Sequence, residues 1–139
     1  MLALDTDLAS LVNTGDPAMQ ARLAAIPPEE RTLPVVVVEE IFRGRLAAIR
    51  AAASVRDARR LVAAYDLLTE SVMFTRGFEI LPYTLAAETL FEKWRKLRIR
   101  IGVRDLRIAA ICSAAGVTMA TRNARDFALV PGLTFAVWA

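Results

Sequence analysis

The sequence of 139 residues contains no histidine and only one cysteine. Without histidine it lacks the most common general base and metal ligand, so any catalysis must use carboxylates, hydroxyls or the thiol. The single Cys112 excludes an internal disulfide and favours a reducing compartment. No apolar run is long enough to span a membrane, and no glycine-rich turn follows the first expected strand. We therefore expect a cytoplasmic protein with no membrane contact and no dinucleotide-binding domain.

The charge is nearly balanced, but the basic residues are grouped. There are 18 Lys and Arg residues against 15 Asp and Glu, a net charge of +3. Seven basic residues lie between Lys93 and Arg107, and six more lie between Arg43 and Arg60. Such groups are usually solvated helix faces, and the alternative is a surface for a polyanion. The hydrophobic content of 55% could leave apolar surface for a partner.

Strand-like and helix-like segments alternate along the chain, which predicts an α/β domain with a mainly parallel sheet of about five strands. The length predicts a single domain over residues 1–139. Helix starts are expected at Asp16 and Pro17, and a helix end at Gly116. Cys112 is expected to pack in an apolar helix face. The expected strands are 2–4, 33–38, 78–81, 117–121 and 134–138, and the longer expected helices are 54–74, 84–97 and 105–115.

Four carboxylates lie at the ends of these expected strands and helices. Asp5, Glu40 and Asp126 come after strands, and Asp105 begins a helix. Ligands of parallel sheets bind beyond the carboxyl ends of the strands, so the four side chains could converge there. Each could also be a helix-terminal or turn residue. Together they would repel one another unless a cation neutralised them, and an all-oxygen set favours Mg²⁺ or Mn²⁺. Such a site can activate water and stabilise a phosphodiester transition state.

These residues lie in four segments that together resemble the PIN-domain ribonucleases of the VapC toxin type. The segments are "LDTD" (4–7), "VEEIFRG" (38–44), "IGVRDLRIAA" (101–110) and "TRNARDFALVPGL" (121–133), and the likeness covers nearly the whole chain. It implies a three-layer α/β/α PIN-like domain. It also implies a catalytic and metal-binding set of Asp5, Glu40, Asp105 and Asp126, supported by Thr6 and Asn123.

The resemblance also decides between neighbouring acids. The family pattern places its glutamate four residues before a glycine, so Gly44 selects Glu40 over Glu39. Asp7 matches a position that is often Asn or Asp, and we expect it to cap the following helix rather than bind metal.

The expected function is a Mg²⁺-dependent endoribonuclease, the toxin of a type II toxin–antitoxin pair, which cleaves RNA with metal-activated water; Mn²⁺ could replace Mg²⁺. The resemblance implies a homodimer and a cognate antitoxin protein. Apolar helices on either side of Arg50 could receive an apolar helix of the antitoxin, with Phe42 as a contact. The arginines expected to contact the RNA backbone are Arg98, Arg100, Arg104, Arg122 and Arg125.

Two other functions fit parts of the sequence. A non-catalytic module that binds protein or RNA would suit the apolar composition and the basic groups, but would leave the four acids unexplained. A haloacid-dehalogenase-like phosphatase would explain "LDTD". In that family, however, Thr or Val stands where this chain has Ala9. The family also has a lysine at a position that neither Lys93 nor Lys96 matches.

Overall fold

The computed structural model describes all residues from 1 to 139, and its centre is a five-stranded sheet in the order β3-β2-β1-β4-β5. Every pair of neighbouring strands is parallel, with Ala3 opposite Thr32 on one side and Met119 on the other. The predicted parallel sheet of five strands is therefore confirmed. The strands are β1 (Leu2–Leu4), β2 (Arg31–Pro34), β3 (Glu79–Leu81), β4 (Thr118–Thr121) and β5 (Phe135–Val137).

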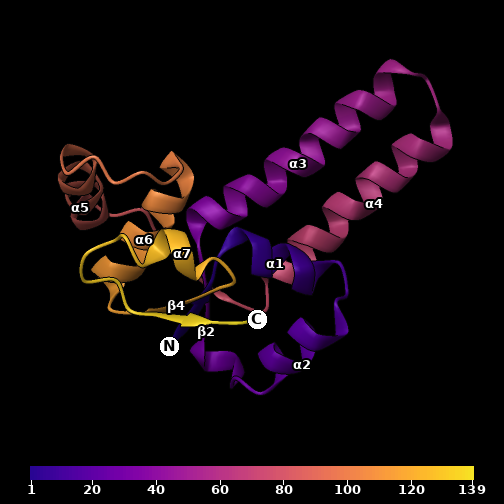
Figure 1. Cartoon of the computed structure of the whole chain (residues 1–139). Coiled ribbons are helices and arrows are strands. Elements are labelled where there is room, and N and C mark those ends of the chain that lie inside the picture. Colours follow the sequence, from indigo (N-terminus) through magenta and orange to yellow (C-terminus); the bar gives the residue numbers. More distant parts are fainter.

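Helices connect the strands and flank the sheet, giving the expected three-layer α/β fold (Figure 1). One cluster of 27 buried residues forms the hydrophobic core. No helix is both long enough and apolar enough to cross a membrane. The helices are α1 (Thr6–Asn13), α2 (Pro17–Ala24), the 3-10 turn η1 (Pro28–Glu30), α3 (Val35–Ser54), α4 (Ala58–Thr75), α5 (Leu85–Lys96), α6 (Val103–Ala115) and α7 (Ala124–Phe127).

The prediction of a strand over residues 33–38 was wrong. The strand β2 ends at Pro34, and the four valines that follow form the first turn of α3. Proline fixes its own φ and lacks an N–H donor, so it is well placed at the start of a helix. β-Branched residues disfavour a helix by only a few tenths of a kcal/mol each. Burial of Val36 and Val37 against the core outweighs that preference.

The predicted helix ends were mostly right. The side chain of Asp16 caps α2 by accepting from the backbone N–H of Met19, and Pro17 is its first residue. Gly116 ends α6 in the left-handed conformation, with φ of 67°. The expected helix over 54–74 is instead α4, which begins at Ala58 after an Asp57 cap, because α3 extends to Ser54. Cys112 is fully buried in α6, as predicted.

Helices α3 and α4 form a long hairpin that projects from the body of the molecule (Figure 1). A buried serine, Ser71, fixes its base. The Ser71 hydroxyl accepts from Nδ2 of Asn13 on α1 at 3.2 Å and from Nε of Arg45 on α3 at 2.8 Å. These contacts join the hairpin to α1, whose first turn lies at the candidate site.

Candidate active site

The topology brings all four candidate carboxylates to the carboxyl edge of the sheet. Asp5 follows β1, Glu40 lies on α3 after β2, and Asp126 lies on α7 after β4. Asp105 arrives by a different route. Because α6 leads into β4, it runs back across the sheet, and its first turn lies at the same edge. Glu40 is six residues beyond the end of β2, in the second turn of α3, and not directly after a strand as expected.

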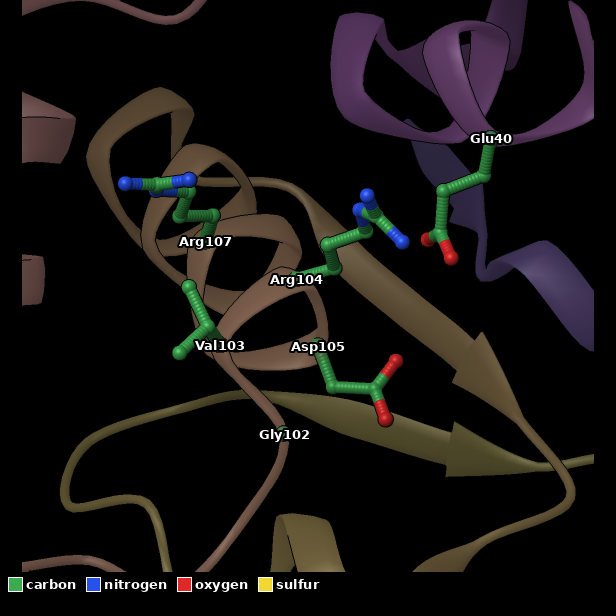
Figure 2. Close-up of a pocket in the computed structure, with 6 residues that line it drawn as sticks. All are labelled: Glu40, Gly102, Val103, Arg104, Asp105 and Arg107. Atoms are coloured by element: carbon green, nitrogen blue, oxygen red, sulfur yellow. The ribbon is translucent and has the colours of Figure 1, made fainter. Parts of the chain in front are cut away.

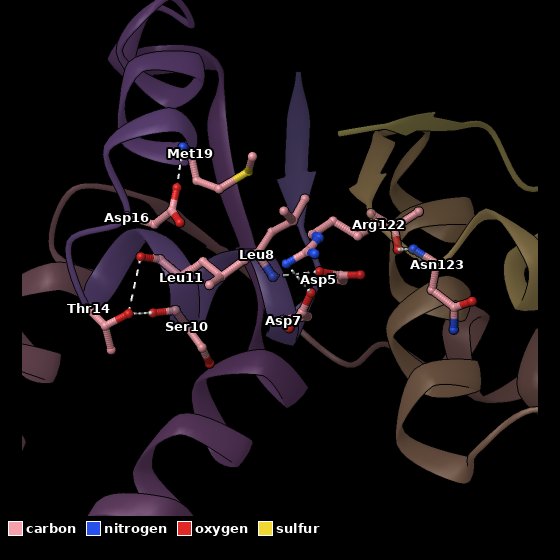
Figure 3. Close-up of polar contacts among 11 residues, drawn as sticks. Asp5, Asp7, Leu8, Ser10, Leu11, Thr14, Asp16, Met19, Arg122 and Asn123 are labelled. Carbon is pink, nitrogen blue, oxygen red and sulfur yellow. Dashed lines mark hydrogen bonds and ion pairs between the residues drawn. The ribbon is translucent and has the colours of Figure 1, made fainter. Parts of the chain in front are cut away.

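Asp5 is the most buried of the four, with 5% of its surface exposed. Its carboxylate accepts a hydrogen bond of 2.9 Å from the backbone N–H of Leu8 and so caps α1 (Figure 3). Burial raises the pKa of Asp5, against the opposing effect of hydrogen bonds from Thr121 and Leu8. A carboxylate kept ionised in such a place stabilises a cation strongly, because little water competes for it.

Asp7 does not cap the helix, so that expectation was wrong. Asp5 is the capping residue because it directly precedes the first helical residue. Asp7 lies in the first turn of α1, exposed, and pairs with Arg122 at 3.7 Å. Figure 3 shows the Arg122 side chain directed toward Asp5 and Asp7.

Glu40 and Glu39 have different surroundings. The Thr6 hydroxyl donates to Oε1 of Glu40 at 2.7 Å, which joins the start of α1 to α3. Glu39 is exposed and lies 3.9 Å from Arg43 of its own helix. Glu40 therefore lies at the site, where its charge acts on Asp105, and its choice over Glu39 as a catalytic residue stays a prediction.

Asp105 and Asp126 complete the acidic group. Burial raises the pKa of Asp105, and the charges of Glu40, Asp5 and Asp126 raise it further. These three carboxylates are therefore near enough to disfavour ionisation of Asp105. Asn123 caps α7: its side chain accepts from the backbone N–H of Asp126 at 3.3 Å and donates to Oδ2 of Asp126 at 2.9 Å.

The donors in this acidic group are all oxygens, which suits a hard divalent cation such as Mg²⁺. Besides burial, the charges of Glu40, Asp5 and Asp126 raise the pKa of Asp105, so the carboxylates of the group repel one another. The side chains are nevertheless spread out: no three of them are close enough together to hold one ion. Their chemistry fits a divalent cation, and joint ligation requires at least some of the carboxylates to move inward.

A cleft of about 440 Å³ opens beside these carboxylates, between α3 and α6. Glu40 forms one wall, and the residues from Gly102 to Asp105, with Arg107, form the other (Figure 2). Figure 2 shows the Arg104 side chain extending toward Glu40.

The other arginines predicted to contact RNA are exposed. Arg98 and Arg100 are exposed in the connection from α5 to α6, and Arg125 is exposed on α7. Arg122 is exposed too, but its ion pair with Asp7 ties it to the acidic edge.

Sequence reasoning missed Thr121, which is fully buried at the end of β4. Its hydroxyl accepts from the backbone N–H of Asn123 at 2.9 Å, and its hydrogen bond to Asp5 lowers the pKa of that carboxyl. A threonine at the carboxyl end of a strand resembles any other β-branched strand residue, so nothing local marks it out. Only the pairing of β1 with β4 brings it to Asp5.

These shifts predict a pH dependence for the metal-free protein. The folded-state pKa of Asp105 is raised above 3.8, so the folded state holds its proton more tightly than the unfolded state does. The contribution of this group to stability therefore falls as pH rises from near 3.8 through the raised folded-state pKa. We expect Asp105→Asn to be more stable than the wild type at neutral pH in chelator, with the difference shrinking as pH falls. Urea melts of both proteins from about pH 4 to about pH 7 test this, and a difference independent of pH would contradict it.

Comparison with known proteins supports the fold. No protein-family model and no curated protein sequence matches the chain. Among solved structures, VapBC2 from Rickettsia felis bound to a DNA fragment from its promoter matches at a TM-score of 0.78, with 17% identity over 99% of this chain and 98% of that one. FitAcB from Neisseria gonorrhoeae matches at 0.72, with 23% identity over 98% and 97%.

A third match is VapC20 from Mycobacterium tuberculosis, a toxin that cleaves the Sarcin-Ricin loop. Its TM-score is 0.57, with 17% identity over 96% of this chain and 97% of that one. The matched proteins are PIN-domain toxins of VapBC and FitAB systems. The protein described here therefore has the PIN-domain fold of the VapC toxins, as the four sequence segments indicated.

Proposed function

We propose that this protein is a Mg²⁺-dependent endoribonuclease and the toxin of a toxin–antitoxin pair. The observation that supports this most is the placement of Asp5, Glu40, Asp105 and Asp126 at one edge of a VapC-type sheet, where their charges interact. One structural neighbour with this fold, VapC20, cleaves RNA. A purely structural role would not account for four acids brought together from four separate elements.

Each residue of the site has a role in this proposal. Asp5, Glu40, Asp105 and Asp126 would hold Mg²⁺, or Mn²⁺ in its place. The bound metal would supply an activated water and stabilise charge on the phosphodiester. Thr6 holds Glu40 in place, and Asn123 holds Asp126 in place. The arginines predicted to contact RNA would position its backbone without reading its sequence.

The direct experiment is cleavage of single-stranded RNA by the purified protein. We expect cleavage in Mg²⁺ or Mn²⁺ and none in excess EDTA. Equal cleavage in EDTA would exclude the metal-dependent mechanism. No cleavage in either metal would exclude nuclease activity on single-stranded RNA.

The partners in this proposal are an antitoxin and a second copy of the chain. The hairpin carries exposed apolar side chains, among them Val62, Tyr65 and Leu67, at 61%, 52% and 39% exposure. A shallow, mainly apolar pocket of about 270 Å³ lies between α3 and α4, lined by alanines, Leu67 and Arg60. A helix of an antitoxin could place its apolar face there. Phe42 is a poor contact because it packs against the core.

Inhibition by the antitoxin tests this surface. We expect Leu67→Lys to weaken inhibition by at least tenfold while cleavage stays near the wild-type rate, because the substitution puts a charge in the apolar pocket far from the acids. The exposed Asp66→Asn serves as the matched control on the same helix. The measurement is cleavage titrated with the protein encoded next to this one. A Leu67→Lys variant that is fully inhibited would show that the antitoxin binds elsewhere.

A further inference from the structure

A second pocket of about 300 Å³ adjoins the cleft beside the acids and shares Arg107 with it. Val35, Val36 and Glu39 of α3 line one side of this pocket, and Tyr83, before α5, lies on another. Arg107 lines both cavities and is the point where they meet. Both pockets are lined by residues of α3 and α6, and we call the two adjoining pockets the groove. The proposed nuclease function uses only its acidic end.

The two arginines of this groove form no ion pair. No carboxylate lies within ion-pair distance of Arg104 or Arg107, although Glu40 and Asp105 line the same cleft. Figure 2 shows Arg104 directed toward Glu40 and Arg107 directed away from the carboxylates. The positive charge thus extends from the acidic site along the groove, which suits consecutive phosphates of a nucleic acid strand.

Neighbouring side chains hold Arg107 in place. Its guanidinium lies 4.8 Å from the centre of the Phe91 ring. Its buried Nε has no hydrogen-bond partner and is therefore a free donor. Its charge acts on the Tyr83 hydroxyl, which also donates to Glu88. An arginine stacked on a ring loses little further freedom when it contacts a phosphate. Arg107 is therefore preorganised to bind an anion.

The second pocket differs from the first in its lining. Tyr83 and the two valines give it an aromatic and apolar wall, and Glu39 adds an exposed hydrogen-bond acceptor. An aromatic wall suits the face of a nucleobase, and a carboxylate suits the amino group on a base edge. A phosphate alone would use neither feature.

We propose that this groove binds the nucleotide next to the scissile phosphate, with Arg104 and Arg107 on its phosphates and its base in the Tyr83 pocket. The proposal rests on the proposed nuclease function, because it takes the acidic end of the groove as the cleavage site. Glu39 would then select bases that carry an amino or imino donor. The protein would cleave with a preference at one position beside the cut.

The test measures binding separately from cleavage. Fluorescence anisotropy of labelled single-stranded RNA oligonucleotides in EDTA gives affinity and its salt dependence. Arg107→Gln should weaken binding about tenfold and reduce the slope of log affinity against log salt by about 0.7, the value for one phosphate contact on a single strand. Arg107→Lys should keep the slope because it keeps the charge. The exposed Arg59→Gln at the tip of the hairpin is the control and should bind as the wild type does.

Cleavage then tests the base pocket. Glu39→Gln, a substitution at an exposed site that leaves the core intact, should change the base preference beside the cut by at least fivefold. Tyr83→Leu should remove most of that preference, and Tyr83→Phe should keep it because the ring remains. One opposing result is that the wild type binds and cuts RNA while the Arg107 variants match its salt slope and the Glu39 variant matches its base preference. That result would contradict the proposed RNA-binding role of the groove but not the nuclease function. A wild type that neither binds nor cuts RNA would overturn both.

Discussion

Asp105→Asn is expected to reduce RNA cleavage by at least a hundredfold while leaving the fold intact. Asn keeps the size and one oxygen of the side chain but removes the charge that a divalent cation needs. Asp105 lies in the first turn of α6 and is only half-buried, so the substitution leaves the core unchanged. The measurement is the initial rate of cleavage in saturating Mg²⁺, with circular dichroism as the check on folding.

The control for this prediction is Asp66→Asn, which makes the same chemical change at an exposed position of α4. It should cleave at the wild-type rate. An Asp105→Asn variant that is folded and retains most of its activity would show that the acidic group is not the catalytic centre.

Mg²⁺ is expected to stabilise the wild type and to lose most of that effect in Asp5→Asn. A ligand that binds only the folded state at a hundred times its dissociation constant adds about 2.7 kcal/mol, or roughly 10 °C in a domain of this size. Asp5→Asn keeps an oxygen to cap α1 at Leu8, so its own fold should survive. Thermal melts with and without Mg²⁺ measure both effects.

The same melts include an internal comparison. Asp105→Asn should be more stable than the wild type in chelator and less stable than it in Mg²⁺, because the charge that repels its neighbours is also the charge that binds the ion. A Mg²⁺ shift of equal size in wild type, Asp5→Asn and Asp105→Asn would mean that the ion binds elsewhere.

The sheet and the acidic edge were predictable from the sequence because both follow from local patterns. Apolar strands alternate with helices, and Asp5, Asp105 and Asp126 each stand in a motif of their own. The strand predicted over 33–38 was wrong because four valines resemble a buried strand, whereas packing of α3 decides their conformation. The capping role was assigned to Asp7 rather than Asp5 because the sequence does not show which residue comes directly before the first helical turn.

The second half of the groove could not be predicted. Tyr83, Glu39 and Arg107 are distant in the chain, and each alone is an ordinary surface or half-buried residue. Only the packing of α3 beside α6 brings them to one pocket. Thr121 was missed for the same reason, since its contact with Asp5 depends on the pairing of β1 with β4.

Cleavage of RNA by metal-activated water at the acidic site can be recognised from the chemistry of the product ends. Without histidine, the chain lacks the base that most often activates a 2′-hydroxyl. Mass spectrometry of RNA cut in Mg²⁺ and H₂¹⁸O should therefore show no 2′,3′-cyclic phosphate. Each cut should leave one phosphate end that carries one ¹⁸O atom and one hydroxyl end that carries none. Products that carry a 2′,3′-cyclic phosphate, or that form equally in EDTA, would contradict this mechanism.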